Sequence, residues 1–220
     1  MKPSEYLHIQ MELEGIRIST GNLIARASPD VDEFPLMLLA STSDEQKYLY
    51  FDSSLSIEVR NRFTRSELQF FNMEHAIEVF HSFGVSSKLG HFRTYRFPDN
   101  IGTDVSNVKS FSQDDPEIVA FGFSGLADKV YAIEREGTIL SACVSSRQNS
   151  QAAEAWVFTH PDHRRKGFAQ QVVMAWARSL QCEGVVPFYS HDLANINSAN
   201  LASKIGLIHL FDESVIEKVA

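Results

Sequence analysis

Three cations and a glycine stand directly before an apolar-striped segment in residues 159–176, THPDHRRKGFAQQVVMAW. The first turn of a helix has four main-chain N–H groups without intrahelical partners and carries a partial positive charge. Arg164, Arg165 and Lys166 add positive charge there, and Gly167 lets a ligand approach the main chain closely. The segment therefore predicts a site for a phosphate or pyrophosphate. A solvated basic turn after a strand is the alternative interpretation.

Two common phosphate-binding motifs are absent from this segment. It lacks the G-x-x-x-x-G-K-[ST] pattern of a P-loop and the G-x-G-x-x-G pattern of a Rossmann fold. Residues 164–169, RRKGFA, instead match an R/Q-x-x-G-x-G/A motif. NINSANLASKIGL at 195–207 matches N-x-x-[AS] followed by an apolar stretch and K-x-G-F, with Leu207 in the last position. One helix and one strand separate the two motifs. Over about residues 113–210 the chain therefore resembles the GNAT superfamily of acyl-CoA-dependent N-acetyltransferases.

The resemblance implies an α/β (α+β) fold with a mixed central sheet whose fourth and fifth strands splay apart. Those strands are AAEAWVFT (152–159) and VVPFYSH (185–191). Acetyl-CoA would be the acyl donor, with no metal. The residues that would hold it are Val157, Phe158, Thr159, Arg164, Arg165, Lys166, Gly167, Phe168 and Ala169, with Asn195 and Ser198 on the far side of the cofactor.

Glu154 is the leading candidate for a general base. It stands in an otherwise apolar strand, where burial would make its carboxylate a stronger base. It could instead face a partner or solvent, and water could carry the proton away. Ala202 stands where many relatives have a tyrosine that is thought to protonate the leaving thiolate, which leaves the general acid open. Tyr189 is a further candidate, although shaping the pocket is the simpler role for it and for its neighbours Ser190 and His191.

The elements that must position these residues follow from hydrophobic period and turn signals. Helices are expected at 167–184, with a buried stripe closed by Gly184, and at 195–206. Residues 129–147 predict two strands around a Glu136–Gly137 turn, and 152–159 predicts a buried strand. A short helix is also expected at 114–123, and one or two strands are expected at 207–219. A strand–helix–strand–helix–strand order indicates a mixed sheet with parallel neighbours.

The first hundred residues match no common core of the superfamily and form an N-terminal α/β extension. We place the boundary in the loop at 99–107, which gives an N-terminal region at 1–105 and an acetyltransferase core at 106–220. The N-terminal region predicts a helix at 3–15 begun at Ser4, although its alternation also permits a strand. It also predicts a hairpin at 35–53, helices at 53–63 and 65–84, and a strand at 89–98. The helix at 65–84 is rich in phenylalanine and is most simply a core helix. Alternatively, it covers the substrate or forms a dimer face.

Composition excludes several classes of protein. The chain has 220 residues and a net charge of −8, which disfavours general nucleic-acid binding. No apolar run approaches a membrane span and the N-terminus lacks a signal peptide, so we expect a cytoplasmic protein without a membrane partner. Cys143 and Cys182 match no metal spacing. His160 and His163 have H-x-x-H spacing without further ligands, so surface histidines are expected.

These observations predict an acyltransferase that moves an acetyl group from acetyl-CoA to the primary amine of a small molecule or peptide by direct attack. A degenerate GNAT domain that binds acyl-CoA as a sensor is the first alternative, and Ala202 keeps it open. An unrelated phosphate-binding protein is the second. A homodimer is possible, and the acceptor is not specified by the sequence.

Overall fold

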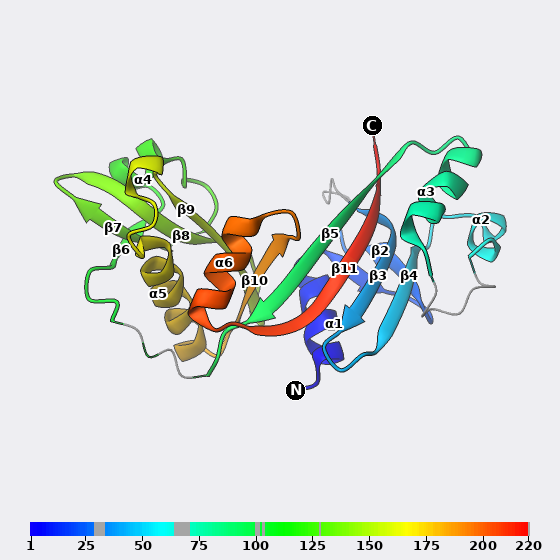
Figure 1. Ribbon diagram of the computed structural model, residues 1–220, viewed down its shortest axis with the longest axis horizontal. Coiled ribbons are helices and arrows are strands. Elements are labelled where there is room, and N and C mark those ends of the chain that lie inside the picture. Colours follow the sequence, from blue (N-terminus) through cyan, green and yellow to red (C-terminus); the bar gives the residue numbers. More distant parts are fainter. Residues whose placement is uncertain (29–33, 64–70, 100–101, 103, 128, 220) are drawn as a thin grey trace. The chain divides into compact units, whose positions relative to one another are not determined.

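The structure, a computed structural model, describes all residues except 29–33, 64–70, 100–101, 103, 128 and 220 (Figure 1). The described chain divides into two compact units. Unit 1 comprises Met1–Thr94, His191–Ala194 and His209–Ala220, and unit 2 comprises Tyr95–Ser190 and Asn195–Ile208. The strand at the C-terminus therefore packs with the N-terminal unit. The division by role at residue 105 remains a prediction. By packing, the chain passes from one unit to the other after Thr94 and again after Ser190, Ala194 and Ile208.

Unit 1 is built on a sheet with the strand order β1-β2-β4-β3-β11-β5. The β3–β4 and β3–β11 pairs are antiparallel, whereas β2 and β4 are parallel. Its elements are α1 (Pro3–Leu13), β1 (Ile16–Ile18), β2 (Leu23–Arg26), β3 (Pro35–Thr42), β4 (Lys47–Asp52), α2 (Ile57–Asn61), α3 (Met73–Ser82), β5 (Ser87–Arg96) and β11 (Ile208–Lys218).

Helix α3 covers one face of this sheet because its apolar residues repeat at helical spacing. Met73, Ala76 and Phe80 are buried in one cluster with Phe51 of β4 and Ile216 of β11. Asn72 begins the helix, and its side chain accepts a hydrogen bond from the N–H of His75 at 3.0 Å. The phenylalanine-rich segment therefore supplies core, as expected.

In unit 1, the sequence predicted the hairpin at 35–53 and the strand at 89–98 better than the helices. The β3–β4 hairpin and strand β5 are confirmed. The N-terminal segment is a helix, and it begins at Pro3 rather than Ser4. The predicted helix at 65–84 begins only at Met73, and the part of that prediction at 65–70 lies outside the described residues. Strands β1 and β2 were not predicted.

Unit 2 contains the strands β10-β9-β8-β7-β6 in that order. Neighbours are antiparallel except β9 and β10, which are parallel. Its elements are β6 (Lys109–Ser112), α4 (Pro116–Phe121), β7 (Lys129–Arg135), β8 (Thr138–Gln148), β9 (Ala152–Thr159), α5 (Phe168–Cys182), β10 (Val186–Asp192), which ends in unit 1, and α6 (Ile196–Ile205). The mixed sheet and all predicted elements of this unit are confirmed, and β6 was not predicted.

Two layers of side chains cover opposite faces of the unit 2 sheet. On one face, α5 and α6 pack in a cluster that contains Cys143 of β8 and Trp176 of α5. On the other face, Ile118 of α4 and the nearby Phe123 pack on Val144 of β8. Cys143 is fully buried in the first of these clusters, and burial raises the pKa of its thiol. Among the described residues, no helix is both long and apolar enough to span a bilayer.

Candidate active site

Strands β9 and β10 separate part way along their length. They pair at Ala152–Val186, Ala153–Pro187 and Glu154–Phe188, and no pairing continues beyond Glu154 although β9 runs to Thr159. The other edge of β9 pairs with β8 as far as Thr159. The predicted splay is therefore confirmed, and it opens directly after Glu154.

The open edge of β9 presents main-chain groups of alternate residues. The N–H of His160 donates to the carbonyl of Leu140 at 2.9 Å, which fixes the direction of the alternation. The N–H and C=O groups of Val157 and Thr159 therefore point away from β8, towards the opening. A strand edge without a strand partner is suited to an extended ligand that carries amides.

The loop between β9 and α5 has two residues in the left-handed region. Arg165 has φ 62° and Gly167 has φ 80°, separated by one residue. Gly167 directly precedes α5, whose first turn has no side-chain cap and no acidic residue. Successive main-chain N–H groups in such a loop form a concave site for an anion. An added Cβ at Gly167 would meet no atom within 4 Å, so the glycine is required by its backbone angle, and the space beside it is open.

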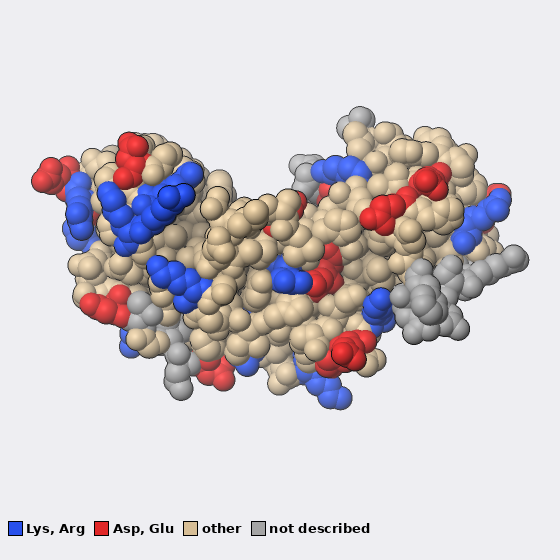
Figure 2. Space-filling view, viewed as in Figure 1, with Lys and Arg blue, Asp and Glu red and all other residues tan. Residues whose placement is uncertain are grey.

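Two cations of this loop donate hydrogen bonds to its main-chain carbonyls and so stabilise its conformation. Arg164 Nε donates to the carbonyl of Thr159 at 3.2 Å, and Lys166 Nζ donates to the carbonyl of Asp162 at 3.2 Å. The guanidinium of Arg135, the last residue of β7, lies 5.6 Å from the centre of the Phe168 ring. Figure 2 shows Lys and Arg side chains gathered at the end of unit 2 where Figure 1 draws this loop. Sequence reasoning missed Arg135, because only the hairpin register brings it to the helix.

Glu154 is 9% exposed and lies at the point where the strands separate. Its neighbours Ala153 and Ala155 pack in the cluster of α5, so its side chain points to the opposite face of the sheet. Glu154 Oε2 accepts a hydrogen bond from Arg147 at 3.1 Å. The carboxylate is therefore placed at the opening, and it already has a cationic partner. The role of base stays a prediction.

Tyr189 lies on the other face of the sheet. It is 2% exposed in the cluster of α5, and its hydroxyl is hydrogen-bonded to Ser198 of α6. Burial raises the pKa of Tyr189, and the bond to Ser198 offsets part of that rise. Asn195 begins α6, where its side chain accepts from the N–H of Ser198 at 3.1 Å. Asn195 and Ser198 therefore both form hydrogen bonds within the protein. Their contact with a cofactor stays a prediction.

The second half of β9 is not buried as the sequence predicted. Trp156 is 45% exposed and Phe158 is 39% exposed, on the same face as Glu154. Phe123 stacks on Trp156 at 5.0 Å, and Phe121 meets Phe158 edge-on at 5.6 Å. Apolar composition indicated burial, but α4 covers these rings only in part. An exposed aromatic surface therefore flanks the opening.

Comparison with known proteins finds a family model that matches the part of the chain that carries this arrangement. Residues 130–212 match the family model described as GNAT acetyltransferase, which covers β7 to the first part of β11. This part of the chain is therefore a domain similar to GNAT acetyltransferases, a family that uses acyl-CoA substrates. Among curated proteins, none matches the chain.

Solved structures show the same fold at low sequence identity. An acetyltransferase of the GNAT family from Colwellia psychrerythraea is 10% identical with a TM-score of 0.54, and the match covers 100% of this chain and 98% of that one. A tandem GNAT protein from the clavulanic acid biosynthesis pathway is 11% identical with a TM-score of 0.51, covering 100% and 96%. A GNAT-family protein from Novosphingobium aromaticivorans DSM 12444 is 15% identical with a TM-score of 0.50, and only 60% of this chain and 66% of that one are covered.

Proposed function

We propose that the protein transfers an acetyl group from acetyl-CoA to the primary amine of a small molecule or peptide by direct attack. The observation that carries this proposal is the end of β9–β10 pairing at Glu154 and Phe188, which leaves the main chain of Val157 open. The pantetheine arm has two amides and would pair with that edge. The diphosphate would bind the N–H groups from Arg165 to Ala169.

The chemistry needs few side chains. The neutral amine attacks the thioester carbonyl carbon, a C–N bond forms, the C–S bond breaks and coenzyme A leaves as the thiolate. The N–H of Val157 would donate to the developing oxyanion. Glu154 would accept the proton that the amine loses, directly or through water. Ala202, which is 1% exposed, has no proton to give, so the thiolate takes its proton from another donor or leaves without one.

A non-catalytic acyl-CoA-binding role is the second candidate. Two observations favour it: the hydrogen bond of Arg147 to Glu154, and the methyl group of Ala202 in the core. Under this candidate the loop still binds the cofactor, but no amine is acylated.

Release of free thiol separates the two candidates. The protein is mixed with acetyl-CoA and a panel of amines that includes amino acids, polyamines and peptides, and thiol is followed with a chromogenic disulfide. Amine-dependent thiol release together with a mass increase of one acetyl group on the amine supports transfer. Binding of CoA without release for any amine supports the second candidate. If CoA stabilises the protein no more than ATP does in a thermal-shift comparison, both candidates are contradicted.

A further inference from the structure

An exposed aromatic surface lies on the same face of the unit 2 sheet as Glu154. Trp156 and Phe158 follow Glu154 at alternate positions of β9, so the three side chains point to one face. Phe123 packs on Trp156 and Phe121 packs on Phe158, with ring centres 5.0 and 5.6 Å apart. We call these four rings the β9 aromatic face, and it borders the opening beyond Glu154.

The other face of β9 is closed by helix α5. Ala155 and Val157 point to that side, where they pack against the buried cluster of the helix. Phe168, in the first turn of α5, packs against the same cluster. An amine that reaches a thioester held along the open edge of Val157 therefore approaches from the β9 aromatic face.

The carboxylate of Glu154 is the acidic end of this face. Glu154 is 9% exposed, Phe188 of β10 pairs with it in parallel register, and Oε2 accepts from Arg147 at 3.1 Å. A carboxylate has about four lone-pair sites, so it can accept an ammonium N–H and keep the bond to Arg147. At the far end, the guanidinium of Arg164 lies 5.9 Å from the centre of the Phe158 ring. A protonated amine is therefore favoured at the Glu154 end of the face.

The distance from the carboxylate to the first exposed ring sets the length of the ligand. Residues two apart on a strand are separated by roughly 6.4–6.8 Å, and their side chains point the same way. An aromatic ring joined to a primary amine by two carbons spans this distance, with the amine on Glu154 and the ring on Trp156. The indole is 45% exposed and stacks with Phe123 at an interplanar angle of 28°, so a ligand ring would extend an existing stack.

The burial of Glu154 also restricts the carbon that carries the amine. A carboxylate that is only 9% exposed is accessible to an amine on an unbranched carbon. An amine on a branched carbon brings a second substituent, which needs room beside that carboxylate. The N-terminus of a peptide is a branched amine of this kind. The geometry therefore favours a small arylethylamine over a peptide.

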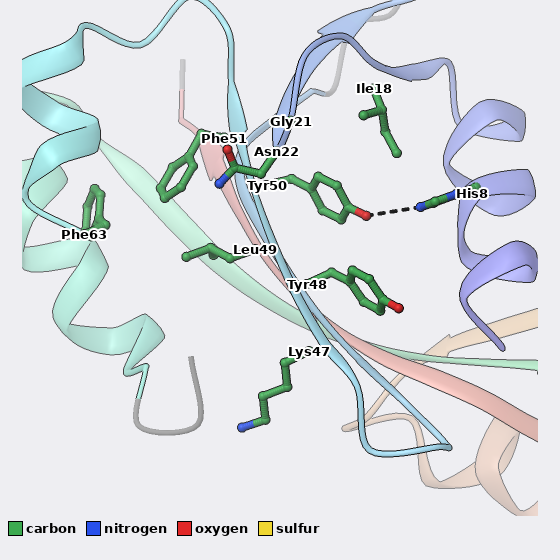
Figure 3. A pocket seen from close by; sticks show the side chains of 10 residues that line it. All are labelled: His8, Ile18, Gly21, Asn22, Lys47, Tyr48, Leu49, Tyr50, Phe51 and Phe63. Atoms are coloured by element: carbon green, nitrogen blue, oxygen red, sulfur yellow. Dashed lines mark hydrogen bonds between the residues drawn. The ribbon is translucent and has the colours of Figure 1, made fainter. Parts of the chain in front are cut away.

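A recess in unit 1 also presents aromatic rings, but it lacks the acidic partner. It has a volume of about 580 Å³, and the stacked rings of Tyr48 and Tyr50, with centres 6.4 Å apart, line it (Figure 3). None of the described residues that line this recess has a carboxylate. A protonated arylethylamine is therefore favoured at Glu154, and the recess provides a control position.

We propose that the β9 aromatic face binds a small primary amine with an aromatic ring two carbons from the nitrogen, as the acceptor of the proposed acyl transfer. Glu154 binds the ammonium group, and Trp156 is the specificity-determining residue because it contacts the ring. The inference rests on the proposed function for the reaction of the amine, whereas binding of the amine can be measured without transfer.

Titration calorimetry of the full chain with saturating coenzyme A measures binding alone, because no acyl group is present. We expect phenethylamine to bind roughly tenfold more tightly than propylamine, since only phenethylamine buries and stacks a ring. It should also bind more tightly than phenylalanine amide, which mimics a peptide N-terminus. The proposal is overturned if propylamine or phenylalanine amide binds as tightly as phenethylamine, or if phenethylamine does not bind at millimolar concentration.

Three variants locate the bound ring. Trp156→Leu removes the indole and should lower the preference for phenethylamine over propylamine by about tenfold, whereas Trp156→Phe keeps a ring and should retain the preference. Tyr48→Leu, in the recess of unit 1, is the control and should not change it. Circular dichroism checks that each variant is folded. A preference that survives in folded Trp156→Leu, or that is lost in folded Tyr48→Leu, overturns the proposal.

Quenching of tryptophan fluorescence by acrylamide tests the same contact in the unaltered chain. The sequence has two tryptophans, and Trp176 is 1% exposed, so the quencher reports on Trp156. Saturating phenethylamine should protect Trp156 from acrylamide, and propylamine should not. Unchanged quenching with phenethylamine bound overturns the proposal, whether or not the variants fold.

Turnover with acetyl-CoA separates this inference from the proposed function. The kcat/KM for phenethylamine should exceed that for propylamine, and Trp156→Leu should raise KM for phenethylamine more than it lowers kcat. Thiol release with similar kcat/KM for both amines supports acyl transfer and overturns this inference. Binding of phenethylamine at Trp156 without thiol release for any amine supports the amine site and contradicts acyl transfer.

Discussion

Glu154 and Phe188 form the last pair between β9 and β10, and every residue of β9 beyond Glu154 has a strand partner on one side only. The single carboxylate on that strand thus lies where the sheet opens. The same opening leads along Val157 to the loop of Arg165 and Gly167. One stretch of chain therefore joins the open strand edge, the loop that we propose as the diphosphate site and the candidate base.

Gly167→Glu should abolish binding of coenzyme A, because it places a carboxylate beside the N–H groups that would hold the diphosphate. Gly184→Glu is the matched control, since Gly184 has φ 76° and also has open space around it, but it lies at the other end of α5. Each variant should lose stability by about 1–2 kcal/mol from the backbone angle. Titration calorimetry checks the affinities, and equal binding of CoA by the two variants would contradict the assignment of the loop.

Glu154→Gln should lower kcat for acetyl transfer by roughly a hundredfold or more while the affinity for CoA stays unchanged. The glutamine keeps the size of the side chain and can still accept from Arg147, but it cannot take up a proton. Glu134→Gln is the control, because Glu134 is another ion-paired carboxylate of unit 2, bonded to Lys109 at 2.6 Å. Stopped-flow measurement of thiol release gives kcat for both variants. Full turnover in Glu154→Gln would contradict the role of Glu154 as the base and would indicate that water accepts the proton.

Asp212→Asn should lower the stability of unit 1 at pH 7 by about 1 kcal/mol. Arg93 donates to both carboxylate oxygens at 2.6 and 2.8 Å, and His209 lies 3.1 Å from one of them. Burial raises the pKa of Asp212, but these bonds together lower it well below its ordinary value. A lowered pKa in the folded state contributes stability above the unfolded pKa of about 3.9, and that contribution is lost as the pH falls towards the folded value.

Urea unfolding at pH 7 and at pH 3 measures this effect. The difference between wild type and Asp212→Asn should shrink at the lower pH, because the unfolded carboxyl is then largely protonated. Asp99→Asn is the control, since the Asp99 side chain is 90% exposed in its pair with Arg96 and should contribute little. A difference that grows on acidification would contradict the ion pair as the cause.

Trp176→Ala should destabilise unit 2 by about 3–5 kcal/mol, because it leaves a cavity in a packed core. Trp176 is 1% exposed, donates to Ser145 Oγ at 2.9 Å and meets the ring of Phe97 edge-on at 5.9 Å. The exposed Trp156 provides the comparison, and Trp156→Ala should cost only about 1 kcal/mol from its stacking on Phe123. Guanidinium unfolding followed by circular dichroism ranks the two, and the reverse order would contradict the packing described for α5.

Local signals were sufficient for much of unit 2. The stripe of α5 predicted its buried face, and the Glu136–Gly137 pair predicted a turn that both residues make with positive φ. The splay of β9 and β10 was expected from the resemblance of two short motifs to a family, and the strand register confirms it. Motifs at helix ends are read well from sequence because a few neighbouring residues set their geometry.

Long-range register accounts for what the sequence did not predict. Nothing in the neighbourhood of Glu154 indicates that Arg147 will lie beside it, because that depends on where the β8–β9 hairpin shifts its register, between Ser145 and Arg147. Strands β1, β2 and β6 have only three or four residues each, too few to show an alternation. Strand β11 pairs with β3 in unit 1, so the C-terminal strand packs with the N-terminal part of the chain. No local sequence pattern encodes a contact between residues so far apart.

A crystal structure of the protein grown with coenzyme A tests the central claim most directly. The account predicts the diphosphate within hydrogen-bond distance of main-chain N–H groups between Arg165 and Ala169, and the pantetheine amides paired with Val157 in the opening beyond Glu154. Clear density for the nucleotide elsewhere, or an unfilled opening at saturating coenzyme A, would contradict it.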